Sequence, residues 1–169
     1  MKYTIMTEPD RAALLGRLAG MPGYLETTFE GLTAAAAATP GPGNAFSPVE
    51  QCWHLADLER IGFATRIRRL LTEDNPSLPE FDGERIAKER DYKSLSLEAG
   101  LDAFRKARAE NLAALQRITV AQWARTGTQE GAGRVALCDV PTMMAEHDAS
   151  HRREIDAWGR SINERPPAA

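Results

Sequence analysis

The chain lacks a cysteine framework, a strong charge imbalance and any long apolar run. Its 169 residues include two cysteines, Cys52 and Cys138, in no C-x-x-C pattern, so we expect reduced thiols. The net charge is −3, with acids and bases interspersed, which leaves no basic surface for nucleic acid. The N-terminal stretch MKYTIMTEPDR has no apolar segment as long as a signal peptide or membrane span. These absences predict a cytoplasmic protein that binds neither nucleic acid nor membrane.

The sequence also has no alternation of apolar and polar residues over a strand's length. Its length suits one domain, residues 1–169, with a hydrophobic core. Four long amphipathic blocks predict an all-α fold, a four-helix bundle.

Capping signals set the limits of the first two blocks. The first begins near Thr7 in TEPD, runs to about Ala38, and is expected to be interrupted near Pro22 in MPG. The second begins at SPVE, where Ser47 is the expected N-cap and Glu50 closes a capping box, and it runs to about residue 71. Its last part, RIRRLL (66–71), is typical of a solvated helix end.

A long connection, residues 72–95, separates the second and third blocks and has room for a short helix at GERIAKER. The third block begins near Ser96, and TVAQW (119–123) predicts a short capped turn after it. QEGAGR (129–134) has no Walker pattern and predicts a flexible loop. The fourth block covers roughly 137–162, with Pro141 in its first turn.

Histidine is scarce: the chain has three. His147 and His151 are four residues apart in MMAEHDASHRREIDAW, so they share one helix face. Apolar residues surround them on that face: Val140, Met144, Ile155, Trp158 and Ile162. The two imidazoles therefore point into the bundle, where each needs a partner.

A metal ion is one such partner, because an i, i+4 histidine pair supplies two adjacent ligands. The remaining histidine, His54, lies inside the second block and could face the pair. The alternative is that the imidazoles are bonded to carboxylates such as Asp57, Asp148 or Glu154.

The combination of FSPVEQCWHLADLER with a distant MMAEHDASHRREIDAW resembles the DinB-like (YfiT-like) superfamily. That resemblance covers most of the chain and implies a four-helix bundle with a divalent metal site, nickel or zinc. It implies that His54, His147 and His151 are the ligands. It also implies a homodimer, and enzymes that act on small molecules with a low-molecular-weight thiol such as bacillithiol, mycothiol or glutathione as co-substrate.

Three ligands would leave a position open for water or substrate. Ligand nitrogens that do not face the metal need acceptors, and Asp57 and Asp148 are the candidates by spacing. Trp53, Met143 and Tyr92 are candidates for the pocket.

Three functions follow: a metal-dependent thiol S-transferase, a hydrolase that uses metal-bound water, or a non-catalytic, stress-associated metal-binding bundle. Cys52 and Cys138 are not expected to face the site. The second block also carries an apolar stripe opposite His54, suited to bundle neighbours or a dimer interface: Val49, Cys52, Ala56, Phe63, Ile67 and Leu70.

Overall fold

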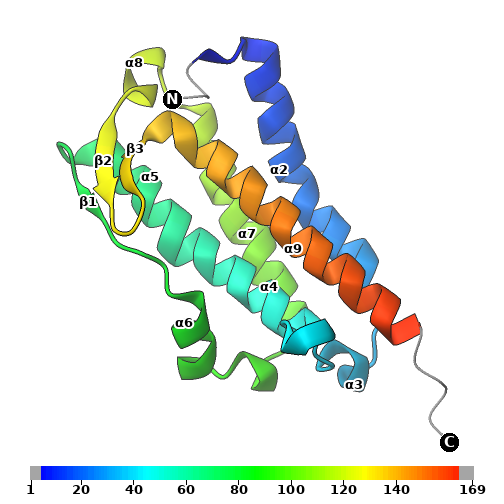
Figure 1. Ribbon diagram of the computed structural model, residues 1–169. Coiled ribbons are helices and arrows are strands. Elements are labelled where there is room, and N and C mark those ends of the chain that lie inside the picture. Colours follow the sequence, from blue (N-terminus) through cyan, green and yellow to red (C-terminus); the bar gives the residue numbers. More distant parts are fainter. Residues whose placement is uncertain (1–4, 164–169) are drawn as a thin grey trace, which may run out of the picture.

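The computed structural model describes residues 5–163 and shows a mostly helical four-helix bundle (Figure 1). The four long segments are α2 (Glu8–Phe29), a composite helix from Pro48 to Thr72, α7 (Leu97–Gln116) and α9 (Val140–Asn163). In Figure 1, α9 lies between α2 and the composite helix, and α7 lies behind. The predicted bundle is thereby confirmed. No helix within the described range is long and apolar enough to cross a membrane; residues 1–4 of the N-terminal stretch lie outside that range.

Three helices begin where the capping signals place them. The Thr7 hydroxyl accepts a hydrogen bond from the Asp10 N–H at the start of α2. Ser47 and Glu50 form the predicted reciprocal capping box, and the Ser96 hydroxyl caps α7. Side chains at these positions satisfy backbone donors that the first helical turn leaves free.

The first predicted block was wrong in two respects. Pro22 does not interrupt α2, which continues to Phe29. Residues 34–37 form a separate short helix, α3 (Ala34–Ala37). Proline removes one backbone donor from a helix interior, but Met21 and Leu25 on either side of it are fully buried. Their packing holds the helix together across the missing hydrogen bond.

The composite helix contains a π-helical segment that the sequence pattern does not reveal. It consists of α4 (Pro48–Asp57), η2 (Leu58–Phe63) and α5 (Ala64–Thr72). The Ala64 N–H donates to the Glu59 carbonyl five residues back, so one turn holds an extra residue. The side chain of Asn111 on α7 also donates to this carbonyl, at 3.0 Å.

The expectation that the chain has no strands was also wrong, since a small three-stranded sheet stands at one end of the bundle (Figure 1). β1 (Ser77–Leu78) pairs in parallel with β2 (Thr126–Gln129), which pairs antiparallel with β3 (Gly133–Ala136). Strands of two to four residues are too short to show alternation. The predicted loop at 129–134 is the turn of this hairpin, and Gly131 and Gly133 adopt the positive φ that it requires.

The remaining predicted helices are present. The long connection carries α6 (Gly83–Glu89) and the turn η3 (Tyr92–Ser94). The short helix α8 (Val120–Trp123) has the predicted cap at Thr119. The turn η4 (Leu137–Asp139) leads into α9, where Pro141 occupies the first turn.

The core is divided into two apolar clusters. One contains Leu14, Leu18, Phe63 and Met144, and the other contains Met21, Leu25, Cys52, Phe104 and Ile155. Along the composite helix, α7 and α9, buried polar residues lie between or beside the members of these clusters. They are His54, Asp57, Glu59, Arg108, Asn111, Asp148 and His151. A polar layer therefore crosses the middle of the bundle.

The second apolar stripe of the composite helix is buried within the chain, because each of its six residues is at most 4 % exposed. The stripe faces bundle neighbours and is not available as a dimer interface. Cys52 and Cys138 are free, fully buried and placed in different apolar clusters. Burial raises the pKa of the Cys52 thiol, which disfavours a reactive thiolate.

Candidate metal centre

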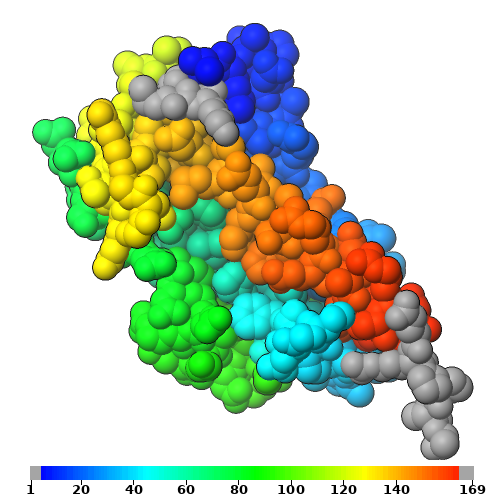
Figure 2. All heavy atoms as spheres, viewed as in Figure 1, coloured from blue at the N-terminus to red at the C-terminus, as the bar shows by residue number. Residues whose placement is uncertain are grey.

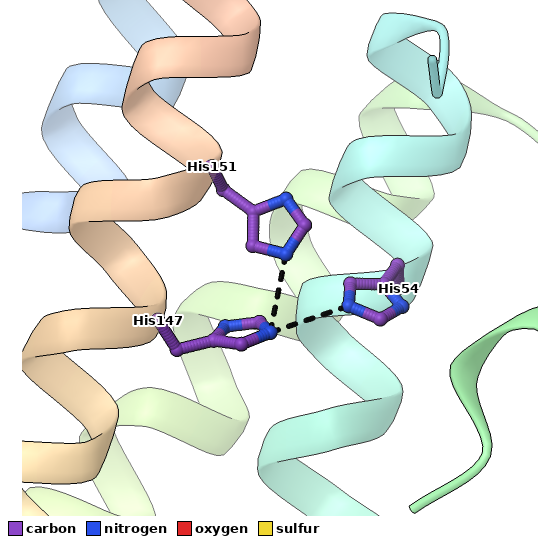
Figure 3. A group of neighbouring side chains, drawn as sticks. All are labelled: His54, His147 and His151. Carbon is purple, nitrogen blue, oxygen red and sulfur yellow. Dashed lines mark hydrogen bonds between the residues drawn. The ribbon is translucent and has the colours of Figure 1, made fainter. Parts of the chain in front are cut away.

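The three histidines meet in the polar layer (Figure 3). His54 projects from α4, while His147 and His151 project from successive turns of α9. The Nε2 atom of His147 lies 3.4 Å from Nε2 of His54 and 3.1 Å from Nε2 of His151. One ring nitrogen from each histidine lies within 4.8 Å of the others. Residues 93 positions apart in the sequence thus form one cluster of nitrogen donors.

Gln51 and Glu154 determine the tautomer of His151. The Gln51 side-chain nitrogen donates to the Glu154 carboxylate at 2.9 Å, so the amide oxygen is the atom that faces His151. That oxygen lies 2.6 Å from Nδ1 of His151, and the Glu154 carboxylate lies 3.1 Å from the same nitrogen. Both groups accept, so Nδ1 carries the proton. The Nε2 atom of His151 therefore presents a lone pair to the cluster.

This arrangement suits a cation better than protons. With neutral rings and a bare Nε2 on His151, a single proton on His147 Nε2 would have to serve both close contacts. A divalent ion accepts all three lone pairs at once. Zn–N bonds of about 2.0–2.1 Å in a tetrahedral site place ligand nitrogens about 3.4 Å apart, close to the separations of 3.1 and 3.4 Å around His147. The residues fit a three-histidine metal site.

Burial keeps His54 and His147 in the neutral form that binds metal. It lowers the pKa of His54 to about 4, assisted by the charge of His151 and opposed by Glu154 and Asp57. Burial also lowers the pKa of His147 to about 3, together with the charges of His151, His54 and Arg108. Hydrogen bonding to His151 is the main cause that lowers the pKa of Glu154 to about 2. At neutral pH the rings of His54 and His147 are therefore uncharged, and the ring of His151 is held by the Glu154 carboxylate.

Neither Asp57 nor Asp148 plays the predicted part of accepting from a histidine. Asp57 accepts from Arg60 at 2.8 Å and from the Tyr92 hydroxyl at 2.7 Å, and it pairs with Arg90. It thereby ties the connection before α7 to α4. Helical spacing placed both carboxylates near a histidine, but arginines outcompete imidazole for them. Gln51 and Glu154 take the predicted role instead.

Asp148 belongs to a buried ionic network that the sequence pattern does not predict. Both of its oxygens accept from Arg108, at 2.7 and 2.8 Å. Arg108 also donates to Glu59 at 3.0 Å and to the Leu18 carbonyl at 2.8 Å. Burial alone would lower the pKa of Arg108, but Asp148 and Glu59 outweigh it and raise the pKa. Every part of this guanidinium has a partner, which is the requirement for a buried charge.

The three predicted pocket residues are separated by the fold. Met143 lines a cavity together with His147. Trp53 packs against the start of α7, where its indole donates to the Ser96 carbonyl at 2.9 Å. Tyr92 is 1 % exposed, and its hydroxyl donates a hydrogen bond to Asp57. Only Met143 is therefore placed to contact a ligand of the histidine cluster.

Two cavities flank the histidines. One, of about 390 Å³, is lined by His54, His151 and Glu154. The other, of about 260 Å³, is lined by His54, His147 and residues of α5 and β2. In Figure 2 the second cavity corresponds to the hollow where teal atoms of the composite helix lie below α9. A larger cavity of about 600 Å³ lies between α2 and α9, but no histidine lines it.

Gly83 allows the long connection to pack closely against the His54 ring. A Cβ at this position would lie 2.6 Å from Cε1 and 2.9 Å from Nδ1 of His54. Such separations are too short for van der Waals contact, so the start of α6 can pack on the His54 ring only with glycine there. Phe46 and Phe81 complete the apolar surroundings of this ring, at centroid distances of 5.3 and 5.7 Å.

A four-helix bundle with three converging core histidines and adjoining cavities defines a class of metal-binding helical proteins. The family model described as "DinB superfamily" matches residues 6–155, and the chain belongs to this superfamily. It is 28 % identical over 142 residues to "Putative metal-dependent hydrolase GK0616" from Geobacillus kaustophilus, which covers 83 % of this chain and 79 % of that protein. Its fold matches that of YfiT from Bacillus subtilis, described as "a probable metal-dependent hydrolase with an unusual four-helix bundle topology", with a TM-score of 0.85. The YfiT match is 19 % identical and covers 94 % of this chain and 90 % of that chain.

Proposed function

We propose that this protein is a metal-dependent hydrolase of a small-molecule substrate. The observation that carries the proposal is the convergence of three imidazoles beside two cavities. The curated relative is named a "putative metal-dependent hydrolase" and the structural neighbour is described as a "probable metal-dependent hydrolase", and both names support the same reaction class. Hydrolysis needs only water as the second reactant, which a site of this kind admits.

His54, His147 and His151 would hold the ion, with Nε2 as the donor atom on each ring. When bound by three imidazoles, a divalent metal supplies Lewis acidity and lowers the pKa of water toward neutrality. Gln51 and Glu154 fix the orientation and the tautomer of His151 and should strengthen it as a donor. The cavities give substrate access to the side of the cluster that faces away from α7.

A thiol-dependent S-transferase is the second candidate that the family resemblance suggests. The protein's own cysteines do not serve it, because both are fully buried in the apolar core. The thiol would therefore come from outside. A non-catalytic metal-binding bundle requires no cavity at the histidines, whereas two adjoin them.

The first experiment measures metal content and turnover in protein purified without a histidine tag. We expect zinc or nickel at about one ion per chain by elemental analysis, and hydrolysis of members of a panel of small esters and amides. His147→Ala should lose the metal and the activity while the far-ultraviolet circular dichroism stays unchanged. Glu146→Ala, an exposed neighbour on the same helix, is the matched control and should keep both.

Product analysis separates the two reactions. A hydrolase releases the acid from an ester at the same rate with or without added bacillithiol or glutathione. Strict dependence on the thiol, with a thioether or thioester as the product, would instead establish the transferase. The Cys52→Ser, Cys138→Ser double variant should retain activity in either case. Full metal stoichiometry in His147→Ala would overturn the assignment of the ligands.

A further inference from the structure

Arg66 on α5 is buried without a counter-charge in contact with it. It is 6 % exposed, although the RIRRLL pattern predicted a solvated helix end. Among residues 5–163 no hydrogen bond or ion pair reaches its guanidinium, and its Nε is an unpartnered buried donor. The Phe63 ring lies 5.4 Å from its Cζ. A buried guanidinium stays charged and is costly when unpaired.

Arg108 shows how the same fold treats an arginine with a structural role. That guanidinium is bonded to Glu59, Asp148 and a backbone carbonyl. Arg66 has comparable burial and none of these partners. The contrast within one core indicates that Arg66 is held ready for a group that the described part of the chain does not supply.

The cavity beside Arg66 is one of the two that reach the histidine cluster. Its walls bring together Arg66, His54 and His147, with the apolar side chains of Leu58, Phe63, Phe81 and Met143. Gln129 at the end of β2 adds a second unpartnered buried atom, its side-chain oxygen. Nδ1 of His54 is also unpartnered, so three residues with an orphaned polar atom, among them one cation and one acceptor, line a single cavity of about 260 Å³.

We propose that Arg66 binds a carboxylate of the substrate and so holds the substrate against the histidine cluster. A planar carboxylate matches the two parallel N–H donors of guanidinium. Gln129 would accept a hydrogen bond from an N–H or O–H on the same molecule. The substrate class is therefore a small carboxylic acid with a neighbouring hydrogen-bond donor. This inference rests on the proposed function only for the reaction that the bound molecule undergoes.

Glu80 sets a condition on this binding. Its exposed side chain lines the same cavity, and its charge acts on Arg66. An incoming carboxylate must compete with it, and a dianion would be repelled more strongly. We therefore expect selection for monoanions, and removal of the Glu80 charge should tighten binding.

The test uses metal-free, full-length protein at pH 7.5, with benzoate as the probe and benzamide as its neutral counterpart. Binding is measured by titration calorimetry. Wild type should bind benzoate at least about tenfold more tightly than benzamide, since a hydrogen bond to a charged group contributes about 1.5–3 kcal/mol. Arg66→Met should abolish this preference. Arg68→Met, which removes an exposed charge from the same helix, should bind like wild type.

Further variants and probes make the result decisive. Glu80→Gln should bind benzoate more tightly than wild type. Arg66→Met should melt at the same or a higher temperature than wild type, since it removes an unpaired buried charge. If Arg66→Met fails to fold, Arg66→Lys takes its place in the binding test, and its affinity for benzoate should be intermediate. Unchanged benzoate binding in both Arg66 variants would overturn the proposal, and so would tighter binding of phenyl phosphate than of benzoate. If the protein binds benzoate through Arg66 yet takes up no metal, the hydrolase proposal is refuted, while the proposed role of Arg66 stands.

Discussion

Acidification should destabilise the metal-free protein through its buried histidines. The pKa values of His54 and His147 are about 4 and about 3 in the folded protein, whereas histidines of an unfolded chain titrate near their ordinary pKa of about 6.5. Between pH 7.5 and pH 5 the unfolded chain therefore takes up protons that the folded state refuses. Stability falls as the pH falls below about 6.5, and it continues to fall until the folded pKa values are reached.

The size of the effect follows from these pKa values. Each histidine should lower the free energy of unfolding by roughly 2 kcal/mol between pH 7.5 and pH 5, so the pair lowers it by roughly 4 kcal/mol. For a chain of this size the melting temperature should fall by roughly 8–16 °C. Most carboxylates remain ionised in this range. Burial raises the pKa of Glu59, which works in the opposite direction because the folded state then binds the proton more readily.

Thermal melts of chelator-treated protein, followed by circular dichroism at pH 7.5, 6.5 and 5, measure the effect. The His54→Gln, His147→Gln double variant lacks both titrating groups but keeps Glu59, so it isolates the histidine contribution. Its melting temperature should depend on pH much less than that of wild type. Equal pH dependence in the two proteins would refute the reasoning. Added zinc should stabilise wild type at both pH 7.5 and pH 5, because His54 and His147 take up protons in the folded protein only near pH 4 and below.

Three substitutions probe the remaining architecture. Arg108→Met leaves Asp148 as an uncompensated buried charge and should lower the free energy of unfolding in urea by about 3–5 kcal/mol; a loss below 1 kcal/mol would contradict the network's structural role. Gly83→Ala forces a Cβ against the His54 ring and should weaken zinc affinity in a chelator competition assay, without loss of helicity. Gln51→Leu removes the acceptor that faces His151 and should weaken zinc binding by about 10–100-fold; unchanged affinity would show that Glu154 suffices.

The sequence predicted much of the bundle because its helices carry local signals. Ser47 with Glu50, Thr7 and Ser96 are short-range capping patterns, and the structure realises each of them. The inward direction of His147 and His151 followed from apolar residues at helical spacing. These features depend on residues within one or two turns of each other.

What the sequence could not supply depends on long-range competition. Asp57 and Asp148 have suitable spacing from the histidines, yet Arg90 and Arg108 bind them from other elements. Gln51, by contrast, reaches His151 across 100 positions of sequence. A glutamine three residues before one ligand histidine is a weak signal, because only the packing of α4 against α9 brings its amide to the second. The cavity beside Arg66 is likewise closed in part by Gln129 of β2, a strand too short to predict.

The π-helical segment sets the rotational phase between the two halves of one helix. In an unbroken α-helix, twelve residues at about 100° each would leave His54 and Arg66 about 120° apart. The extra residue in the wide turn takes back about 100°, leaving roughly 20°, and both side chains line the same cavity. Deleting one residue from Leu58–Phe63 would restore a regular helix and keep the two side chains in phase, since eleven residues at about 100° each also leave roughly 20°. Closing the wide turn to a regular α-helical turn without a deletion would instead rotate Arg66 about 100° away from His54. The geometry of one helical turn, as well as the identity of the side chains, therefore sets whether His54 and Arg66 line one cavity.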